Sequence, residues 1–142
     1  IYAIAAGVAE GLNLGENAKS ALISRSFAEM TRYAKKFKAD KNTLFGLSGL
    51  GDLILTCSSK NSRNTQFGIK LASSKYDNFL DLLKSQEVTE GYYTVKAVYN
   101  ISQKKNIDMP IMESVYNILY KQHDLKEELS NLLSRPITEE KI

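Results

Sequence analysis

Residues 16–38, ENAKSALISRSFAEMTRYAKKFK, decide the fold. Apolar side chains recur here at intervals of three and four residues, which places them on one face of a helix. Gly15 and Asp40 fit the two ends of such a helix, and a cluster of lysines near its end complements the helix dipole. We therefore predict a long amphipathic helix that packs against a core and carries no chemistry. Its predicted buried face consists of Ile23, Phe27, Met30, Ala34 and Phe37.

Further helices are predicted on both sides of this stretch. Upstream, residues 1–12 are small and apolar, a composition that allows helices to approach closely. Downstream, a helix over residues 92–104 follows the segment Thr89-Glu90-Gly91. Pro110 stands where a proline in the first turn would open the next helix.

A last helix is predicted to begin at Asp124, whose carboxylate can cap it while Glu127 closes a capping box. The chain has only two prolines, and no stretch shows the sustained alternation of a strand. The predicted fold class is therefore all-α, in a single multi-helix domain over residues 1–142. The expected buried face of the last helix consists of Leu125, Leu129, Leu132 and Leu133.

Composition narrows the class of protein. Apolar residues make up 43% of the chain and charged residues 25%, which is typical of a globular domain. The net charge of +3 suits an anionic ligand but is too small to indicate nucleic acid. Cys57 and His123 are the only cysteine and histidine, so we expect no internal disulfide and no metal site. No segment has the length of a membrane span, and a reducing cytoplasm fits best.

The start of the chain is unusual. It begins Ile1-Tyr2-Ala3-Ile4 without a methionine, and its continuous apolar run suggests a helix whose beginning and neighbour lie outside this sequence. We therefore expect the chain to be part of a longer protein.

Residues 46–57, GLSGLGDLILTC, place three glycines before Asp52 and an apolar run. Small residues allow another group to come close, but the glycine spacing is not that of a dinucleotide-binding turn. Taken alone, the segment indicates a turn between two helices, with Asp52 in the first turn of the second helix, where the dipole favours a negative charge.

Residues 58–64, SSKNSRN, form a polar segment before the apolar Phe67, Ile69 and Leu71, as at the start of a helix. Unpaired backbone N–H groups there, together with hydroxyl, amide and guanidinium donors, would suit a phosphate group. Ordinary N-capping with a solvated Arg63 explains the same residues equally well.

The order of these segments resembles one known family, the NAD(P)-dependent glycerol-3-phosphate dehydrogenases, over essentially the whole chain. The glycine-aspartate and Ser-Arg-Asn segments in succession are far more specific than either alone. The residues that carry the resemblance are Ala6-Gly7, Glu10-Gly11-Leu12, Gly15 to Lys19, Ala21 to Arg25, Ala28-Glu29-Met30, Gly49 to Leu53, Leu55-Thr56-Cys57, Ser62-Arg63-Asn64, Phe67-Gly68, Val88 to Gly91 and Met109-Pro110-Ile111.

The resemblance implies a two-domain enzyme that interconverts glycerol 3-phosphate and dihydroxyacetone phosphate by hydride transfer with NAD or NADP. A Rossmann-like N-terminal domain would bind the cofactor, and the helical domain present here would close the active site. The family's general base is a lysine in a Lys-Asn pair, expected directly before the apolar start. The chain alone is therefore expected to be inactive. Its own nucleotide-binding domain is the expected protein partner. The oligomeric state stays open from the sequence, with a homodimer as one alternative.

The resemblance also assigns roles to individual residues. Asp52 matches the active-site aspartate that would orient the lysine and the substrate hydroxyls. Ser62, Arg63 and Asn64 match the substrate-binding segment, and Thr56 is a further candidate for a substrate hydrogen bond. Arg63, Val88 and Glu90 match positions that touch the cofactor. Ala5, where glycine is common, and Thr89, between two cofactor-contact positions, depart from the family pattern.

Two other functions remain open from the sequence. A non-enzymatic helical binding module would use the mild positive charge to hold RNA or a protein, and its basic residues should gather from several helices. A helical domain of a related hydroxy-acid dehydrogenase is the second, against which Ser62-Arg63-Asn64 favours a phosphate substrate.

Overall fold

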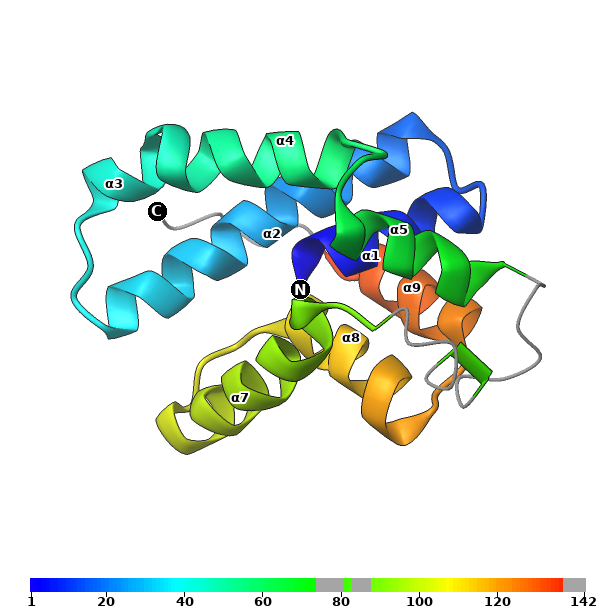
Figure 1. Cartoon of the computed structure of the whole chain (residues 1–142). Helices are drawn as coiled ribbons and strands as arrows, with labels where there is room; N and C mark the ends of the chain where they lie inside the picture. The colour runs from blue at the N-terminus through cyan, green and yellow to red at the C-terminus, as the bar shows by residue number, and fades with distance from the viewer. Residues whose placement is uncertain (74–80, 83–87, 137–142) are drawn as a thin grey trace.

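Helices make up every secondary-structure element in the computed structural model, which describes residues 1–73, 81–82 and 88–136. No strand occurs in these ranges, so the all-α prediction is confirmed. None of the described helices combines the length and apolar character needed to cross a membrane. The helices, labelled in part in Figure 1, are α1 (Tyr2–Gly11), α2 (Glu16–Lys36), α3 (Lys41–Phe45), the π-helical turn η1 (Leu47–Gly51), α4 (Asp52–Ser58), α5 (Arg63–Ala72), α7 (Glu90–Lys105), α8 (Pro110–Lys121) and α9 (Leu125–Leu133).

The small apolar helix α1 lies at the centre of this arrangement, where residues 3–9 are all buried. It packs most extensively against α5 and also contacts α2, α4 and α8 (Figure 1). Glycines permit the crossing with α5, because a Cβ on Gly7 would lie 2.1 Å from the carbonyl oxygen of Thr65. A Cβ on Gly68 would lie equally close to the carbonyl oxygen of Ile4, at 2.1 Å. The apolar start of the chain is therefore covered by helices of the chain itself.

The long helix α2 is confirmed, but its predicted end and buried face need correction. It ends at Lys36, Phe37 is the C-cap, and Lys38 has a positive φ of 57°. Phe37 is consequently 45% exposed, with Tyr33 and Lys105 against its ring. The most buried line along α2 runs through Leu22, Ser26 and Glu29, next to the apolar residues that were expected there. Ile23, Phe27 and Met30 are only half-buried against the core.

Glu29 is the buried carboxylate that fixes the start of α8. Its two oxygens accept hydrogen bonds from the backbone N–H groups of Ile111, at 2.8 Å, and Met112, at 2.9 Å. Burial raises the pKa of Glu29 to about 7, although these two hydrogen bonds and nearby Arg32 favour the charged form. A residue of α2 thereby satisfies N–H groups that a helix beginning leaves unpaired.

The start of α8 agrees with the sequence, and Pro110 occupies its first turn. Helix α7 begins at Glu90, two residues before the predicted start, and Thr89 is its N-cap. Asp124 is the N-cap of α9, but its side chain makes no capping hydrogen bond, so the predicted capping box is wrong. Glu128 instead contacts His123 Nδ1 at 2.7 Å, an exposed pair that holds this turn. Leu129 and Leu132 are buried as predicted, while residues 125 and 133 are half-buried.

Candidate functional site

The glycine-rich segment before Asp52 forms a π-helical turn rather than a turn between helices. η1 runs directly into α4, because Gly51 has helical backbone angles of φ −60° and ψ −47°. Gly49 allows the tight return from α3, since a Cβ there would lie 2.1 Å from the carbonyl oxygen of Leu44. Asp52 therefore lies within a continuous helical path and caps nothing with its side chain. Turns of the π type are frequent at functional sites.

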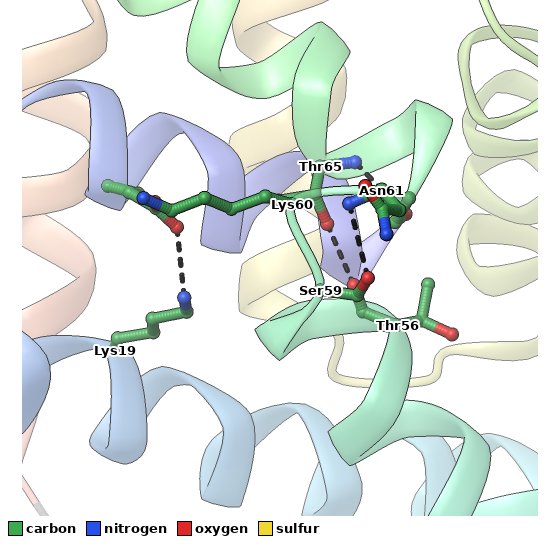
Figure 2. Close-up of polar contacts among 8 residues, drawn as sticks. Lys19, Thr56, Ser59, Lys60, Asn61 and Thr65 are labelled. Carbon is green, nitrogen blue, oxygen red and sulfur yellow. Dashed lines mark hydrogen bonds and ion pairs between the residues drawn. The ribbon is translucent and has the colours of Figure 1, made fainter.

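Asp52 and Thr56 lie one helical turn apart on α4, so their side chains share a face. Asp52 is exposed, and Thr56 is half-buried. The backbone oxygen of Thr56 accepts a hydrogen bond from Thr65 Oγ1 at 2.8 Å, which ties the end of α4 to α5. Figure 2 shows this contact beside the turn in which Ser59 Oγ accepts from the Asn61 N–H at 3.1 Å.

Ser62 is the N-cap of α5, as the N-capping interpretation of residues 58–64 predicts. Its Oγ accepts a hydrogen bond from the Thr65 N–H at 3.3 Å. Within the described part of the chain, the backbone N–H groups of Arg63 and Asn64 have no hydrogen-bond partner. Both interpretations are compatible, because capping by Ser62 leaves these two donors open at the positive end of the helix dipole.

Arg63 faces the start of α7. Its Nη1 lies 3.0 Å from Glu90 Oε1, and the two side chains are 71% and 68% exposed. An ion pair this exposed adds little to stability, so both groups can exchange this contact for a ligand at low cost. Val88, just before α7, packs half-buried against the core.

Asn64 joins the same two helix starts from the inside. Its Oδ1 accepts hydrogen bonds from Thr89 Oγ1 at 2.6 Å and from the Gly91 N–H at 3.1 Å. Thr89 is only 4% exposed. The sequence analysis does not predict that Thr89 and Gly91 contact Asn64; it identifies Thr89 only as a departure from the family pattern between two cofactor-contact positions.

The structure thus gathers most, but not all, of the residues expected at a site. Arg63, Asn64 and Glu90 come together where α5 and α7 begin. Asp52 and Thr56 form a second group on α4, and among the described residues no hydrogen bond or ion pair joins Asp52 to Arg63. Convergence of Asp52 and Arg63 in one cleft therefore stays a prediction.

A hollow of about 180 Å³ lies elsewhere, between the end of α1 and the start of α2. Glu10 there pairs with Lys19 at 2.9 Å and with Lys60 at 3.6 Å, and the hydrogen bond from Lys19 lowers the pKa of Glu10 (Figure 2 includes Lys19 and Lys60). These contacts join α1, α2 and the segment before α5. None of the residues that line this hollow was predicted to belong to the site. It is lined by Glu10, Asn13, Gly15, Glu16 and Lys19.

Cys57 is buried, and burial raises the pKa of its thiol to about 11, as expected of a core cysteine and not of a nucleophile. Across residues 1–73, 81–82 and 88–136, no three His, Cys, Asp or Glu side chains gather as metal ligands would.

Comparison with known proteins agrees with the sequence resemblance. The family model described as "NAD-dependent glycerol-3-phosphate dehydrogenase C-terminus" matches residues 1–130. A glycerol-3-phosphate dehydrogenase [NAD(P)+] of Solidesulfovibrio magneticus is 46% identical over 141 residues, which is 99% of this chain and 42% of the relative. One of Colwellia psychrerythraea is 44% identical over 135 residues, 95% of this chain and 40% of the relative. The chain thus spans less than half the length of these relatives.

Solved structures give the same result. The crystal structure of glycerol-3-phosphate dehydrogenase from Coxiella burnetii matches with a TM-score of 0.88 and 38% identity, over 94% of this chain and 41% of that one. Glycerol-3-phosphate dehydrogenase of Saccharomyces cerevisiae matches with a TM-score of 0.80 and 26% identity, over 94% and 39%. Sequence and fold agree along nearly the whole chain, and this chain therefore belongs to the family of C-terminal domains of NAD-dependent glycerol-3-phosphate dehydrogenases.

Proposed function

We propose that this chain is the substrate-binding domain of an enzyme that interconverts glycerol 3-phosphate and dihydroxyacetone phosphate with NAD or NADP. The observation that carries the proposal is the meeting of two helix starts, where Arg63 and Asn64 of α5 lie against Glu90 of α7. Its partner would be a nucleotide-binding domain that precedes it. We also propose a cytoplasmic location, consistent with the free, buried Cys57.

The substrate's phosphate would bind at the start of α5. The open N–H groups of Arg63 and Asn64 point out of the helix end, where the dipole favours an anion. The exposed guanidinium of Arg63 adds a charged donor with a planar, forked geometry that suits phosphate oxygens. The hydroxyl of Ser62 keeps its proton free to donate, because capping uses only an oxygen lone pair.

The hydroxyl end of the substrate would lie along α4. Asp52 and Thr56, one turn apart, offer a carboxylate and a hydroxyl on one face. The carboxylate would hold the lysine that takes the proton from the C2 hydroxyl, a lysine that the family resemblance places outside these 142 residues. Asp52 would be a positioning residue for that base and for the substrate.

The cofactor would supply the hydride acceptor for the C2 carbon. Arg63 and Glu90 fit a role at its edge, because both are more than two-thirds exposed and carry a donor and an acceptor for phosphate and ribose groups. Val88 would contribute an apolar contact beside them. We propose that this chain supplies only these edge contacts, since the described residues contain no parallel sheet of the dinucleotide-binding kind.

Exposed apolar side chains near Asp52 support a partner domain at this face. Leu47 is 90% exposed and Leu55 is 68% exposed, on either side of Asp52 along the same helical path. Ile54 at 47% and Phe45 at 48% are also exposed, and the Phe45 ring packs edge-on against Phe27, with the ring centroids 5.2 Å apart. Large apolar groups gathered on a surface commonly mark an interface. The nucleotide-binding domain is the proposed occupant, and a homodimer contact is a separate proposal for size measurements to test.

Binding and turnover test the proposal separately. In the 142-residue chain, titration with glycerol 3-phosphate should shift the backbone amide resonances of Arg63 and Asn64, and glycerol should not. Arg63→Ala should abolish these shifts, whereas the control Arg135→Ala, far along the sequence on an exposed site, should keep them. NADH formation should require the complete protein. Turnover by the 142-residue chain alone, or shifts confined to other residues, would contradict the proposal.

A polyanion-binding module has one observation in its favour. The ends of α2 and α7 meet, with Lys105 Nζ 5.2 Å from the Phe37 ring, so lysines of two helices gather there. Asp40 and Asp108 lie in the loops that follow these helices and offset part of the charge. A filter-binding measurement with RNA at physiological salt should show only weak, nonspecific retention if the enzyme assignment is correct.

A further inference from the structure

The Asn64 side chain is held by two donors that come from one short segment. Thr89 Oγ1 lies 2.6 Å and the Gly91 backbone N lies 3.1 Å from the same atom, Asn64 Oδ1. Thr89 and Gly91 are both buried, and Asn64 is half-buried. The contact spans 25 to 27 residues of sequence, so it belongs to the tertiary structure and not to local capping.

The two hydrogen bonds determine which end of the Asn64 amide faces Thr89 and Gly91. A backbone N–H can only donate, so the atom that faces Gly91 must be the amide oxygen. An amide oxygen has two lone pairs, and Thr89 and Gly91 occupy both. The Nδ2 group at the other end of the amide can act only as a donor of two N–H groups. No hydrogen bond in the described ranges uses Nδ2.

The close approach depends on the absence of a side chain at residue 91. A Cβ on Gly91 would lie 2.4 Å from Asn64 Oδ1 and 2.8 Å from Ile4 Cδ1. The start of α7 could not reach Asn64 with any larger residue, and the Thr89 hydroxyl would move away with it. Segment 89–91 is therefore shaped around the Asn64 amide.

We propose that Thr89 is a positioning residue that fixes the Asn64 amide so that only N–H donors face the phosphate of the substrate. This inference rests on the proposed function. A reversed amide would turn its carbonyl oxygen toward a phosphate dianion, where it repels instead of binding. Thr89 thus favours an anionic substrate without touching it.

Thr89→Val in the complete protein tests this role, because valine keeps the shape of threonine and removes the hydroxyl. The KM for glycerol 3-phosphate should rise about three- to tenfold, the range for losing one neutral hydrogen bond. The kcat and the KM for NAD should change less than twofold, because the Thr89 hydroxyl bonds to Asn64 and not to Val88, Glu90 or the general base. Thr89→Ser should restore the wild-type KM, since serine keeps the hydroxyl.

Thr94→Val is a matched control. Thr94 is an exposed threonine on the same helix, and its Oγ1 donates to the Glu90 backbone oxygen at 3.0 Å. This variant should keep the wild-type KM. In the 142-residue chain, the side-chain amide resonances of Asn64 should also broaden or shift in Thr89→Val and not in Thr89→Ser, a readout that needs no activity.

The outcomes separate the two proposals. An unchanged KM in Thr89→Val, or a Thr89→Ser variant as impaired as Thr89→Val, would overturn the positioning role while Arg63→Ala still weakens substrate binding. A complete protein that does not oxidise glycerol 3-phosphate would overturn the proposed function and this inference with it.

Discussion

The middle and the start of α5 differ in burial and in what they contact. In the middle, Phe67 and Gly68 are buried against α1, and Thr65 has no exposed surface. At the start, Arg63 is 71% exposed and its N–H has no described partner. The middle of α5 thus packs closely against α1, while its start, one turn away, exposes charged donors to solvent.

The difference shows how a small domain can hold an open site rigidly. The start of α5 contributes little to its own stability, but the crossing with α1 fixes where its donors point. Substitutions at the crossing should therefore lower folding stability, while substitutions at the open start should alter ligand binding and leave the fold intact.

Gly68→Ala should cause the largest loss of stability. The new Cβ would lie 2.1 Å from the Ile4 backbone oxygen and 2.8 Å from the Val8 backbone N, so the two helices would have to move apart. We expect the free energy of unfolding to fall by about 3 kcal/mol, the upper end of the usual range for overpacking. This corresponds to a fall in Tm of about 10 °C. Thermal melts of the 142-residue chain measure it.

Gly46→Ala is the control for this measurement. The nearest atoms to a Cβ at Gly46 lie 3.6 Å away, and its φ is −82°, which alanine adopts freely. This variant should melt within about 2 °C of the wild type, corresponding to about 0.5 kcal/mol. Equal losses at Gly46 and Gly68 would show that the α1–α5 crossing is not the tight contact described above.

Glu29 should make stability depend on pH. Burial raises its pKa from 4.5 to about 7, so the folded chain binds this proton more tightly than the unfolded chain does. Its contribution is therefore full below pH 4.5 and is lost as the pH rises through 7, by about 2 kcal/mol between pH 5 and 7.5. Urea unfolding at both pH values, on wild type and Glu29→Gln, measures the difference. The stability of wild type relative to Glu29→Gln should fall with pH, and a constant difference would contradict the raised pKa.

The residues that sequence analysis predicted correctly have local causes. Pro110 marks a helix start because its effect is confined to a single turn. Glu29 was not recognised as buried, since its partners Ile111 and Met112 lie 82 and 83 residues away. The α9 capping box failed for a related reason: Glu128, not Glu127, is engaged, by His123 of the preceding turn and by Asn117 of α8. Spacing predicts what one helix does and not which distant group it meets.

The same limit applies to the candidate site. The Ser62-Arg63-Asn64 segment and Asp52 were found from motif order, but the pairing of Arg63 with Glu90 and of Asn64 with Gly91 joins positions 27 residues apart. Sequence reasoning could assign both segments to one site only through the family resemblance. The geometry adds which atom of Asn64 is already engaged.

Arg63→Ala should cost little stability and much binding. The exposed ion pair with Glu90 contributes at most about 1 kcal/mol to folding. In the complete protein the same change should weaken the interaction with glycerol 3-phosphate by about 1.5–3 kcal/mol, the range for hydrogen bonds to charged groups. Steady-state kinetics and thermal melts on the same variant give both numbers. An unchanged kcat/KM would remove Arg63 from the proposed site.

Asp52→Asn should have the smallest effect on folding, because the Asp52 carboxylate does not cap α4. A helix start favours a negative charge only where its N–H groups are open, and here η1 continues into α4 so that Asp52 is already inside the helical path. Asn keeps the size of the side chain, and the unfolding free energy of the 142-residue chain should change by less than about 0.5 kcal/mol.

In the complete protein, however, loss of the Asp52 charge that would hold the lysine should lower kcat and shift its pH dependence, while the KM for glycerol 3-phosphate changes less. Kinetics across pH, set beside melts of the same variant, separate the two effects. A normal rate profile together with a clear loss of stability would make Asp52 a structural residue of α4 and would place the proton chemistry elsewhere.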